Sequence, residues 1–254
     1  MREFTIARRA WIIISAVAAA CAIAFGALII DRLIDYGRSG SAYGAMREAV
    51  TLSGEAASAR GGEGGYRPPV DMEALSRINP DAVGWLRITE TAIDYPVARG
   101  ADNAAYLARS FDGGKSNGGS IFLDARNRRD LTDPNNVIYG HNMRDGSMFG
   151  SLKGFRAEEY ALAHSEANFY GLSEGYRLAP FSVYTAGASG DYMRVEFASE
   201  ADFDEWIAEV ASNSEFAIGE APKGGERVLT LVSCVPESRE SRVVVHMAMK
   251  PYSE

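Results

Sequence analysis

The chain has 254 residues, 46% of them hydrophobic and 24% charged, which suits one sizeable globular domain with room for an additional anchoring segment. Its formal net charge of −8 argues against broad binding to nucleic acids or anionic membranes, because both need a basic face. A local basic patch remains compatible with this overall balance.

The N-terminal part of the chain contains a long apolar segment. Residues 11–30 read WIIISAVAAACAIAFGALII, an uncharged stretch of about the length that a helix needs to cross a bilayer. Arginines precede it within residues 1–10, and the basic flank of such a segment usually stays in the cytoplasm. We therefore expect a cytoplasmic tail (1–10), a single transmembrane signal anchor (11–30) in the cell membrane and an extracellular C-terminal bulk.

Two other fates of this segment stay open. The small residues around 16–20 are compatible with a cleavable signal peptide, although the apolar run continues past them. Lipidation of Cys21 is the second alternative, although the residues after Cys21 remain hydrophobic.

The composition changes after the apolar segment. Residues 31–69 are rich in Gly, Ser and Ala and end in the run GGEGGYRPP at 61–69. Such a composition does not build a core, so it predicts a stalk or linker, interrupted by a short helix near 42–52.

From about residue 70 to residue 254 the pattern is one of short strands separated by turn signals. Val, Ile, Tyr and Phe fill the strands, and Gly, Asn and Asp separate them, which favours a mainly-β domain built as a closed or nearly closed barrel of about eight strands. The individual strands are expected at 83–88, 93–97, 119–123, 136–141, 176–186, 227–234 and 242–249.

Three peripheral helices are expected to interrupt these strands. Two of them are expected at 102–111 and 147–155. The third has the clearest signature, because Ser199 to Asp202 resembles a capping box and a stripe of apolar residues follows it. We expect this stripe (Phe203, Trp206, Ile207, Val210) to pack on the barrel.

Three residue types at strand ends carry possible chemistry. Cys234 ends an apolar strand and is the only cysteine outside the N-terminal segment; a cysteine of this kind is either a buried small hydrophobe or a nucleophile. His141 stands where a strand meets a Gly-rich turn, and Arg242 opens the last strand. Together they offer a thiol nucleophile, an imidazole proton carrier and a fixed positive charge for an oxyanion.

Several sequence blocks follow one another between residues 72 and 250. They are INPDAVGWL at 78–86, IDYPV at 93–97, Asp102 and Asn103 with Tyr106 and Leu107, GSIFLD at 119–124, YGHNM at 139–143, SMFG at 147–150, TLVSC at 230–234, and Arg242. With these blocks in this order, the chain resembles a class B sortase, a membrane-anchored cysteine transpeptidase of Gram-positive bacteria. The helix before the Cys234 strand is similar to the one that sets class B apart.

The resemblance implies a sortase-like barrel and a two-step reaction. Cys234 would attack the threonyl carbonyl of a C-terminal sorting motif, and His141 would protonate the leaving amine. Arg242 would hold the substrate and stabilise the oxyanion. The acyl group would then pass to an amine of a lipid-linked peptidoglycan precursor. Because an unperturbed thiol is mostly protonated at neutral pH, only a small share of molecules would hold Cys234 as a thiolate beside a protonated His141.

The resemblance also implies weaker assignments around this trio. Asn103, Leu107 and Ser233 match substrate-binding positions, with Ser233 in the place of the usual threonine. Val232 and Val235 replace polar residues of the family, which leaves the preferred sorting motif open. Arg239 competes with Arg242 for the arginine role; we prefer Arg242 because it begins the strand, as the family arginine does.

Two other functions remain open for this sequence. A pilin-polymerising sortase would use a lysine of another subunit as the acceptor, and a non-catalytic surface scaffold would be expected to lack the trio. The histidines at 141, 164 and 246 are far apart and lack metal-ligand spacing, so no metal and no cofactor are expected. His164 and His246 are expected to be surface or barrel residues.

Overall fold

The computed structural model divides the chain into two compact units, 1–42 and 43–254, and each is described by itself. The structure describes the backbone of residues 2–51, 66, 68–223, 225–235 and 238–252. Within these ranges it leaves out the side chains of residues 2–10, 12–13, 16, 28–39, 234–235 and 238–240.

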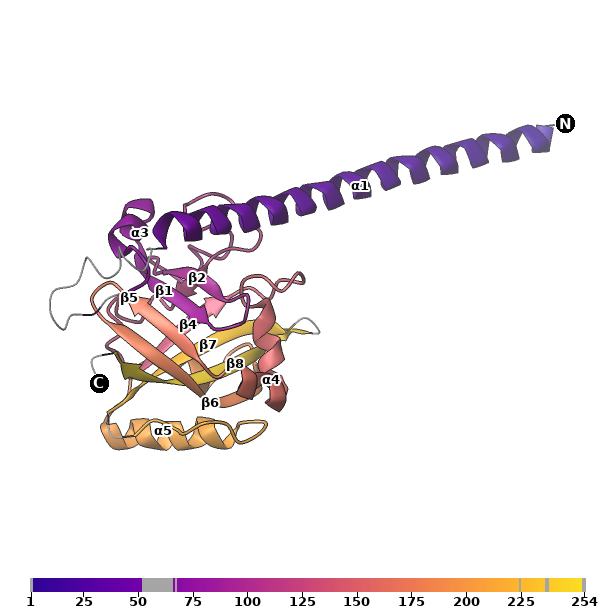
Figure 1. Cartoon of the computed structure of the whole chain (residues 1–254). Coiled ribbons are helices and arrows are strands. Elements are labelled where there is room, and N and C mark those ends of the chain that lie inside the picture. The colour runs from indigo at the N-terminus through magenta and orange to yellow at the C-terminus, as the bar shows by residue number, and fades with distance from the viewer. Residues whose placement is uncertain (1, 52–65, 67, 224, 236–237, 253–254) are drawn as a thin grey trace. The chain divides into compact units, whose positions relative to one another are not determined.

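The N-terminal unit is helical. A single helix, α1, runs from Arg2 to Val50 and includes both the expected anchor and the short helix expected near 42–52 (Figure 1). Among the residues described, no helix is long and apolar enough to span a membrane. The side chains at 12–13, 16 and 28–30 of the expected anchor lie outside that description.

The last turns of α1 belong to the larger unit. Tyr43, Met46 and Val50 are buried, and their spacing puts them on one face of the helix. The Tyr43 hydroxyl donates to the carbonyl of Gly119 at 3.2 Å. The larger unit therefore begins well before residue 70, and part of the expected stalk contributes to its core. Residues 52–65 and 67 of that stalk lie outside the described residues.

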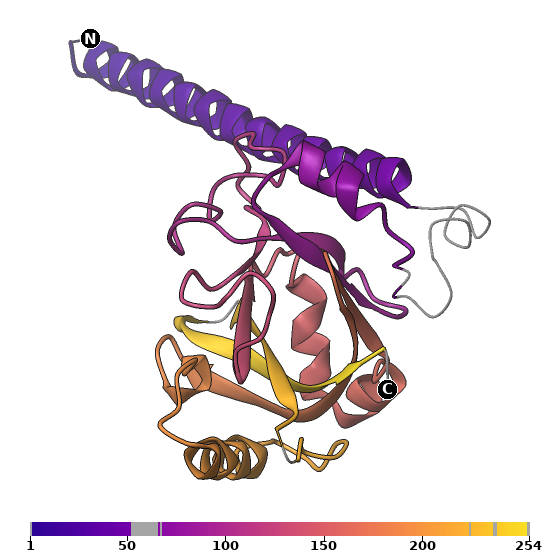
Figure 2. The same ribbon diagram turned by 90° about the vertical axis from the view of Figure 1, so that its left-hand side faces the viewer.

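Eight strands form the closed barrel that the sequence predicts. Their order around the barrel is β1-β2-β3-β4-β7-β8-β6-β5, and Figures 1 and 2 show the barrel from two sides. The pairs β2–β3 and β4–β7 are parallel, and the others are antiparallel. The strands are β1 Ala82–Ile88, β2 Asp94–Ala98, β3 Ile121–Leu123, β4 Asn135–Gly140, β5 Ala167–Gly171, β6 Gly175–Gly187, β7 Arg227–Val235 and β8 Ser238–Pro251.

Two strands differ from the sequence prediction. The sequence analysis missed β5, which pairs with β1 and β6. Its sequence is ANFYG, and Ala, Asn and Gly are depleted in strands, so the segment carries little strand signal. Strand β8 begins at Ser238 and not at Arg242, so Arg239 lies in the strand and not in a loop before it.

The helix expected at 102–111 is wrong. The Asp102 carboxylate accepts from the amides of Ala104 and Ala105 and starts a series of turns. The carbonyls of Tyr106 and Ala108 then accept from the amides of Ser120 and Ser116. Carbonyls that an α-helix would use internally are thus taken by a later segment.

The remaining helices are short, apart from α5. The helix expected at 147–155 is a 3₁₀ helix that begins and ends slightly later. These helices are α3 Met72–Ile78, η1 Gly150–Arg156, α4 Glu158–Ala163, η2 Asp191–Met193 and α5 Glu200–Ser212.

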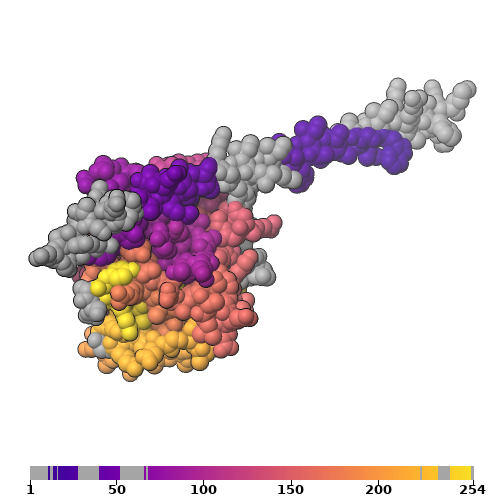
Figure 3. Space-filling model, viewed as in Figure 1, coloured from indigo at the N-terminus to yellow at the C-terminus, as the bar shows by residue number. Residues whose placement is uncertain are grey.

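Helix α5 packs outside the barrel beside β6, β7 and β8, as predicted (Figures 1 and 2). The Ser199 hydroxyl caps it by accepting from the amide of Asp202 at 3.2 Å. All four residues of its apolar stripe are buried in one cluster with side chains of the three strands. In the space-filling view its residues form one edge of the larger unit (Figure 3). The loop before α5 contains η2, which reaches the candidate site.

Candidate active site

The parallel pairing of β4 with β7 brings the predicted histidine and cysteine together in register. Pairing continues without a shift to Gly140 opposite Ser233. His141 and Cys234 are the next residues of the two strands. On the other side of β7, Cys234 pairs with Arg242 of β8. The three predicted catalytic residues thus occupy neighbouring positions, His141 directly after β4, Cys234 in β7 and Arg242 in β8, although the side chain of Cys234 lies outside the description.

Close packing fixes the end of β4. A Cβ atom on Gly140 would come within 2.5 Å of Ile121 Cδ1 and 2.6 Å of Phe149 Cγ, so only glycine fits there. The amide of Phe149 donates to the carbonyl of His141 at 2.9 Å. The segment before and after His141 is therefore held from both sides.

Ser233 belongs to this packing and not to the candidate site. Its side chain is buried, and its hydroxyl donates to the carbonyl of Phe149 at 3.3 Å. Successive residues of a strand point to opposite faces, and its neighbour Val232 lines the cavity described next. The structure therefore does not bring Ser233 to the cavity.

A cavity of about 240 Å³ opens over these strand ends. It contains both described members of the trio, His141 and Arg242, together with the predicted substrate-binding residues Asn103 and Leu107. Its full lining is Asn103, Leu107, Phe122, Tyr139, Gly140, His141, Ala188, Tyr192, Met193, Val232 and Arg242. The lining is mostly apolar with a few polar groups, which is the usual composition of a site for an organic ligand.

The two described members of the trio differ in charge. His141 is half-buried, and burial lowers the pKa of its imidazole below the ordinary value of 6.5. It is therefore neutral in most molecules at pH 7. Arg242 is also half-buried, and its Nη1 donates to the carbonyl of Ser241 at 2.9 Å. A guanidinium stays charged at this pH, so the cavity holds one fixed cation beside one proton acceptor.

The alternative arginine has a different place. Arg239 lies in β8, beyond a break in the β7–β8 register between Cys234 and Val235. Its side chain is not described. Arg242 is therefore the arginine that the structure places directly opposite Cys234 and in the cavity.

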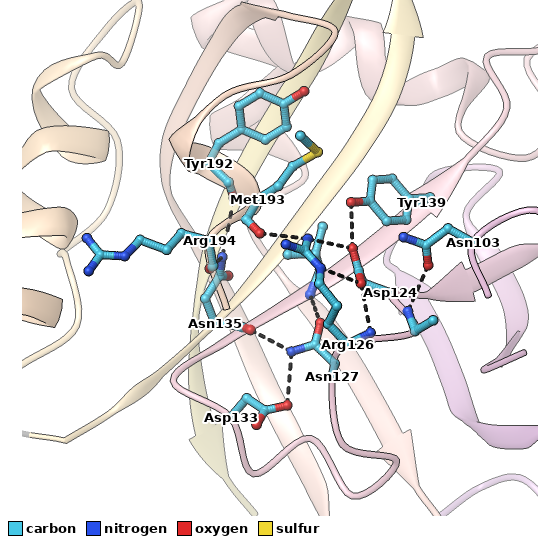
Figure 4. A network of polar contacts seen from close by, with 12 residues as sticks. Asn103, Asp124, Arg126, Asn127, Asp133, Asn135, Tyr139, Tyr192, Met193 and Arg194 are labelled. Carbon is cyan, nitrogen blue, oxygen red and sulfur yellow. Dashed lines mark hydrogen bonds and ion pairs between the residues drawn. The ribbon is translucent and has the colours of Figure 1, made fainter. Parts of the chain in front are cut away.

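The sequence analysis missed several residues of the cavity wall. Tyr139 could have been inferred, because it lies in β4 two positions before His141, and residues two apart along an extended segment point to the same face. No sequence pattern indicated Tyr192 and Met193, because they come from a loop about 50 residues after His141. Figure 4 shows the polar contacts that surround these residues.

Comparison with known proteins gives a consistent result. A family model described as a sortase domain matches residues 86–250. Sortase B of Listeria monocytogenes is 34% identical over 177 residues, which cover 69% of this chain and 72% of the relative. Sortase B of Staphylococcus aureus is 30% identical over 176 residues, covering 68% and 72%. The crystal structure of sortase B from B. anthracis in complex with AAEK1 has a TM-score of 0.74 and 30% identity, covering 85% of this chain and 98% of that one.

Proposed function

This chain belongs to the sortase family, as a class B sortase and thus a cysteine transpeptidase, and from that premise we propose the following reaction. It cleaves a C-terminal sorting motif of secreted proteins after threonine and transfers the acyl group to an amine of a cell-wall precursor. The observation that carries this proposal is the register that brings His141, Cys234 and Arg242 to neighbouring positions beside one cavity.

The first half of the reaction forms an acyl-enzyme. The Cys234 thiol gives its proton to the neutral imidazole of His141, and the thiolate adds to the threonyl carbonyl carbon. The guanidinium of Arg242 stabilises the negative charge on the carbonyl oxygen. The C–N bond then breaks, His141 returns its proton to the leaving amine, and a thioester remains on Cys234.

The second half transfers the acyl group. The acceptor amine attacks the thioester carbon while His141 takes a proton from the amine. The C–S bond breaks, an amide forms, and the thiolate leaves. Because burial disfavours the charged form of His141, only a minority of molecules hold the imidazolium and thiolate together at neutral pH. This supports an enzyme with a modest turnover rate.

The cavity provides the binding site for the sorting motif in this proposal. Leu107, with 47% of its surface exposed, offers an apolar contact, and Asn103 offers a polar one. The N-terminal segment holds the enzyme at the cell membrane with the catalytic unit outside. The uncharged sequence of 11–30 and the continuous helix from Arg2 to Val50 support this anchor.

The test is to trap the thioester. The purified full-length protein is incubated with a library of sorting-motif peptides, and the adduct is located by mass after digestion, because Cys21 is a second thiol. We expect one adduct, on Cys234, and its loss in Cys234→Ala with an unchanged thermal melt. Turnover retained by Cys234→Ala would refute the assignment. Adding either a peptidoglycan stem peptide or a lysine-bearing pilin peptide then identifies the acceptor: transfer to lysine alone would favour pilus assembly.

A further inference from the structure

We propose that the segment Asp124–Arg126 holds three walls of the cavity in place for the donor peptide, with Asp124 and Arg126 as its positioning side chains. The inference rests on the proposed function, because it concerns how the same cavity binds its donor. The segment follows β3. The side chains of Asp124 and Arg126 contact strand β4 and the 3₁₀ helix η2, and the amide of Ala125 between them contacts the loop that carries Asn103 (Figure 4).

The Asp124 carboxylate is the centre of this arrangement. Its side chain is completely buried and accepts from Arg126 Nε at 2.9 Å, from Arg126 Nη2 at 2.8 Å and from the Tyr139 hydroxyl at 2.8 Å. Burial alone would raise the pKa of Asp124, but the hydrogen bonds from Arg126 and Tyr139 lower it below its usual range. A buried carboxylate with these donors is fixed in orientation.

The first wall is Tyr139 on β4. Because its hydroxyl donates to Asp124, the ring is held over the cavity, next to the ring of Phe122 at a centroid distance of 5.4 Å. Burial, followed by the nearby Asp124 charge, raises the pKa of Tyr139, so its hydroxyl keeps its proton and remains a donor. His141 lies two residues after Tyr139, directly beyond the end of β4.

The second wall is Asn103. The amide of Ala125, between the two positioning residues, donates to Asn103 Oδ1 at 2.7 Å. A backbone N–H can only donate, so this contact assigns the oxygen of the side-chain amide to Ala125. The NH₂ group of Asn103 is then the part left for a ligand. The cavity should accordingly recognise a carbonyl oxygen at this position and not an N–H group.

The third wall is η2, with Tyr192 and Met193. Arg126 Nη2 donates to the carbonyl of Met193 at 2.9 Å while the same group binds Asp124. The neighbouring carbonyls, in and directly after η2, are also bound, since Trp206 Nε1 donates to Asp191 and Asn135 Nδ2 to Tyr192 and Arg194. Arg126 binds both Met193 and Asp124, and Asp124 binds Tyr139, so Arg126 links Met193 to Tyr139 and sets the spacing between these two walls.

Arg126→Lys is the variant that tests the positioning role most directly. Lysine keeps the charge opposite Asp124, so the buried carboxylate is not left unpaired, but an ammonium cannot reproduce the planar fork that reaches both Asp124 and Met193. Arg128→Gln is the matched control, because Arg128 is an exposed arginine two residues away whose contact with Asp133 spans 3.9 Å.

Two measurements are made on the full-length protein. In single-turnover acylation, Arg126→Lys should raise the half-saturating concentration of donor peptide roughly ten- to a hundredfold, with a smaller change in the maximal rate. In methyl spectra of the protein with labelled methionines, the Met193 signal should shift in Arg126→Lys, and that of Met247, which is buried in β8, should not. Arg128→Gln should match the parent in both, and all three proteins should melt alike.

The outcomes separate the two proposals. A parent protein that forms no thioester with any peptide would refute the proposed function, and the methionine spectra would still decide the positioning role. An unmoved Met193 signal, or an unchanged half-saturating concentration beside an active parent, would overturn the positioning role. A lower maximal rate with unchanged peptide affinity would also overturn it, since that pattern belongs to the reacting groups and not to the walls.

Discussion

Arg242 shows how a single side chain can be tested against its neighbour. A guanidinium gives two parallel hydrogen bonds to an oxyanion, which lysine cannot reproduce. Arg242→Lys should therefore slow acylation by roughly 10²–10³-fold, the usual loss for an oxyanion donor, while Arg239→Lys should change it little. Single-turnover formation of the thioester measures both, with thermal melts as the control for folding. A slow Arg239→Lys beside an unaffected Arg242→Lys would exchange the two roles.

The sequence was sufficient for some residues of the site and not for others. His141 and Cys234 stand at the ends of β4 and β7 in recognisable blocks, so their neighbouring places could be predicted, whereas Arg242 lies inside β8 and not at its start. Met193 and Tyr192 could not be predicted, because the carbonyls of η2 are held by side chains distant in sequence, such as Trp206 and Asn135. Ser233 matched a family position, but the strand alternation directs it to the interior.

Among the strands, β4, β6, β7 and β8 are joined by a directional chain of buried polar groups. Asn135 Nδ2 donates to the carbonyl of Tyr192 in η2 and to that of Arg194 directly after this helix, so its oxygen faces Thr230, whose hydroxyl donates to it at 2.6 Å. Having donated its proton, Thr230 must accept from His246 Nδ1 at 2.8 Å. The Tyr184 hydroxyl then donates to His246 Nε2 at 3.0 Å. The chain fixes one neutral tautomer of His246.

This chain makes stability depend on pH. Burial lowers the pKa of His246 to about 3, whereas the unfolded chain should titrate near 6.5. Between pH 3 and pH 6.5, His246 is protonated in the unfolded state but neutral in the folded state. The free energy of unfolding should therefore fall as the pH falls from 6.5 toward 3. His246 changes the free energy of unfolding by about 1.4 kcal/mol per pH unit at most.

Denaturant unfolding at a series of pH values between 7 and 4 measures this contribution. His246→Asn keeps a donor for Thr230 but does not titrate, so it should be less stable at pH 7 and should lose stability less steeply on acidification. Carboxylates and His141 titrate in both proteins and cancel in the comparison. Equal slopes for the two proteins would contradict the assignment to His246.

The elements themselves were predictable where their pattern was local. Strands filled with Val, Ile, Tyr and Phe and bounded by turn residues were found from the sequence, as was the capped helix α5 with its apolar stripe. The segment 102–111 was mistaken for a helix because its composition favours one, while its carbonyls bind the amides of Ser116 and Ser120. Strand β5 was missed because three of its five residues, Ala167, Asn168 and Gly171, are of types depleted in strands, and its place is set by pairing with β1 and β6.

At the scale of the whole molecule, the start of the catalytic unit can be tested by truncation. A chain that begins at residue 41 keeps Tyr43, Met46 and Val50, and one that begins at residue 70 loses them. Each fully buried side chain of this kind contributes about 1.5–3 kcal/mol. The shorter chain should therefore melt at least about 5 °C lower, whereas the longer one should melt like the full-length protein.

Circular dichroism melts of the three chains check this expectation. The ion pair of Arg47 with Asp94, at 2.8 Å, offers a matched variant: Arg47→Gln should lower the melting temperature far less than removal of the three buried residues, because the pair is partly exposed. Identical melts for the chains beginning at 41 and 70 would restore the domain boundary that the sequence suggested.

The parallel pairing of β4 with β7 also determines when the active site forms during synthesis of the chain. Its two strands are separated by about 90 residues of chain, and such non-local pairings form late in folding. During synthesis His141 emerges long before its partners, and Arg242 arrives only with the final strand. A growing chain therefore carries no assembled site until β8 has been made, so synthesis itself delays the first turnover until the barrel can close.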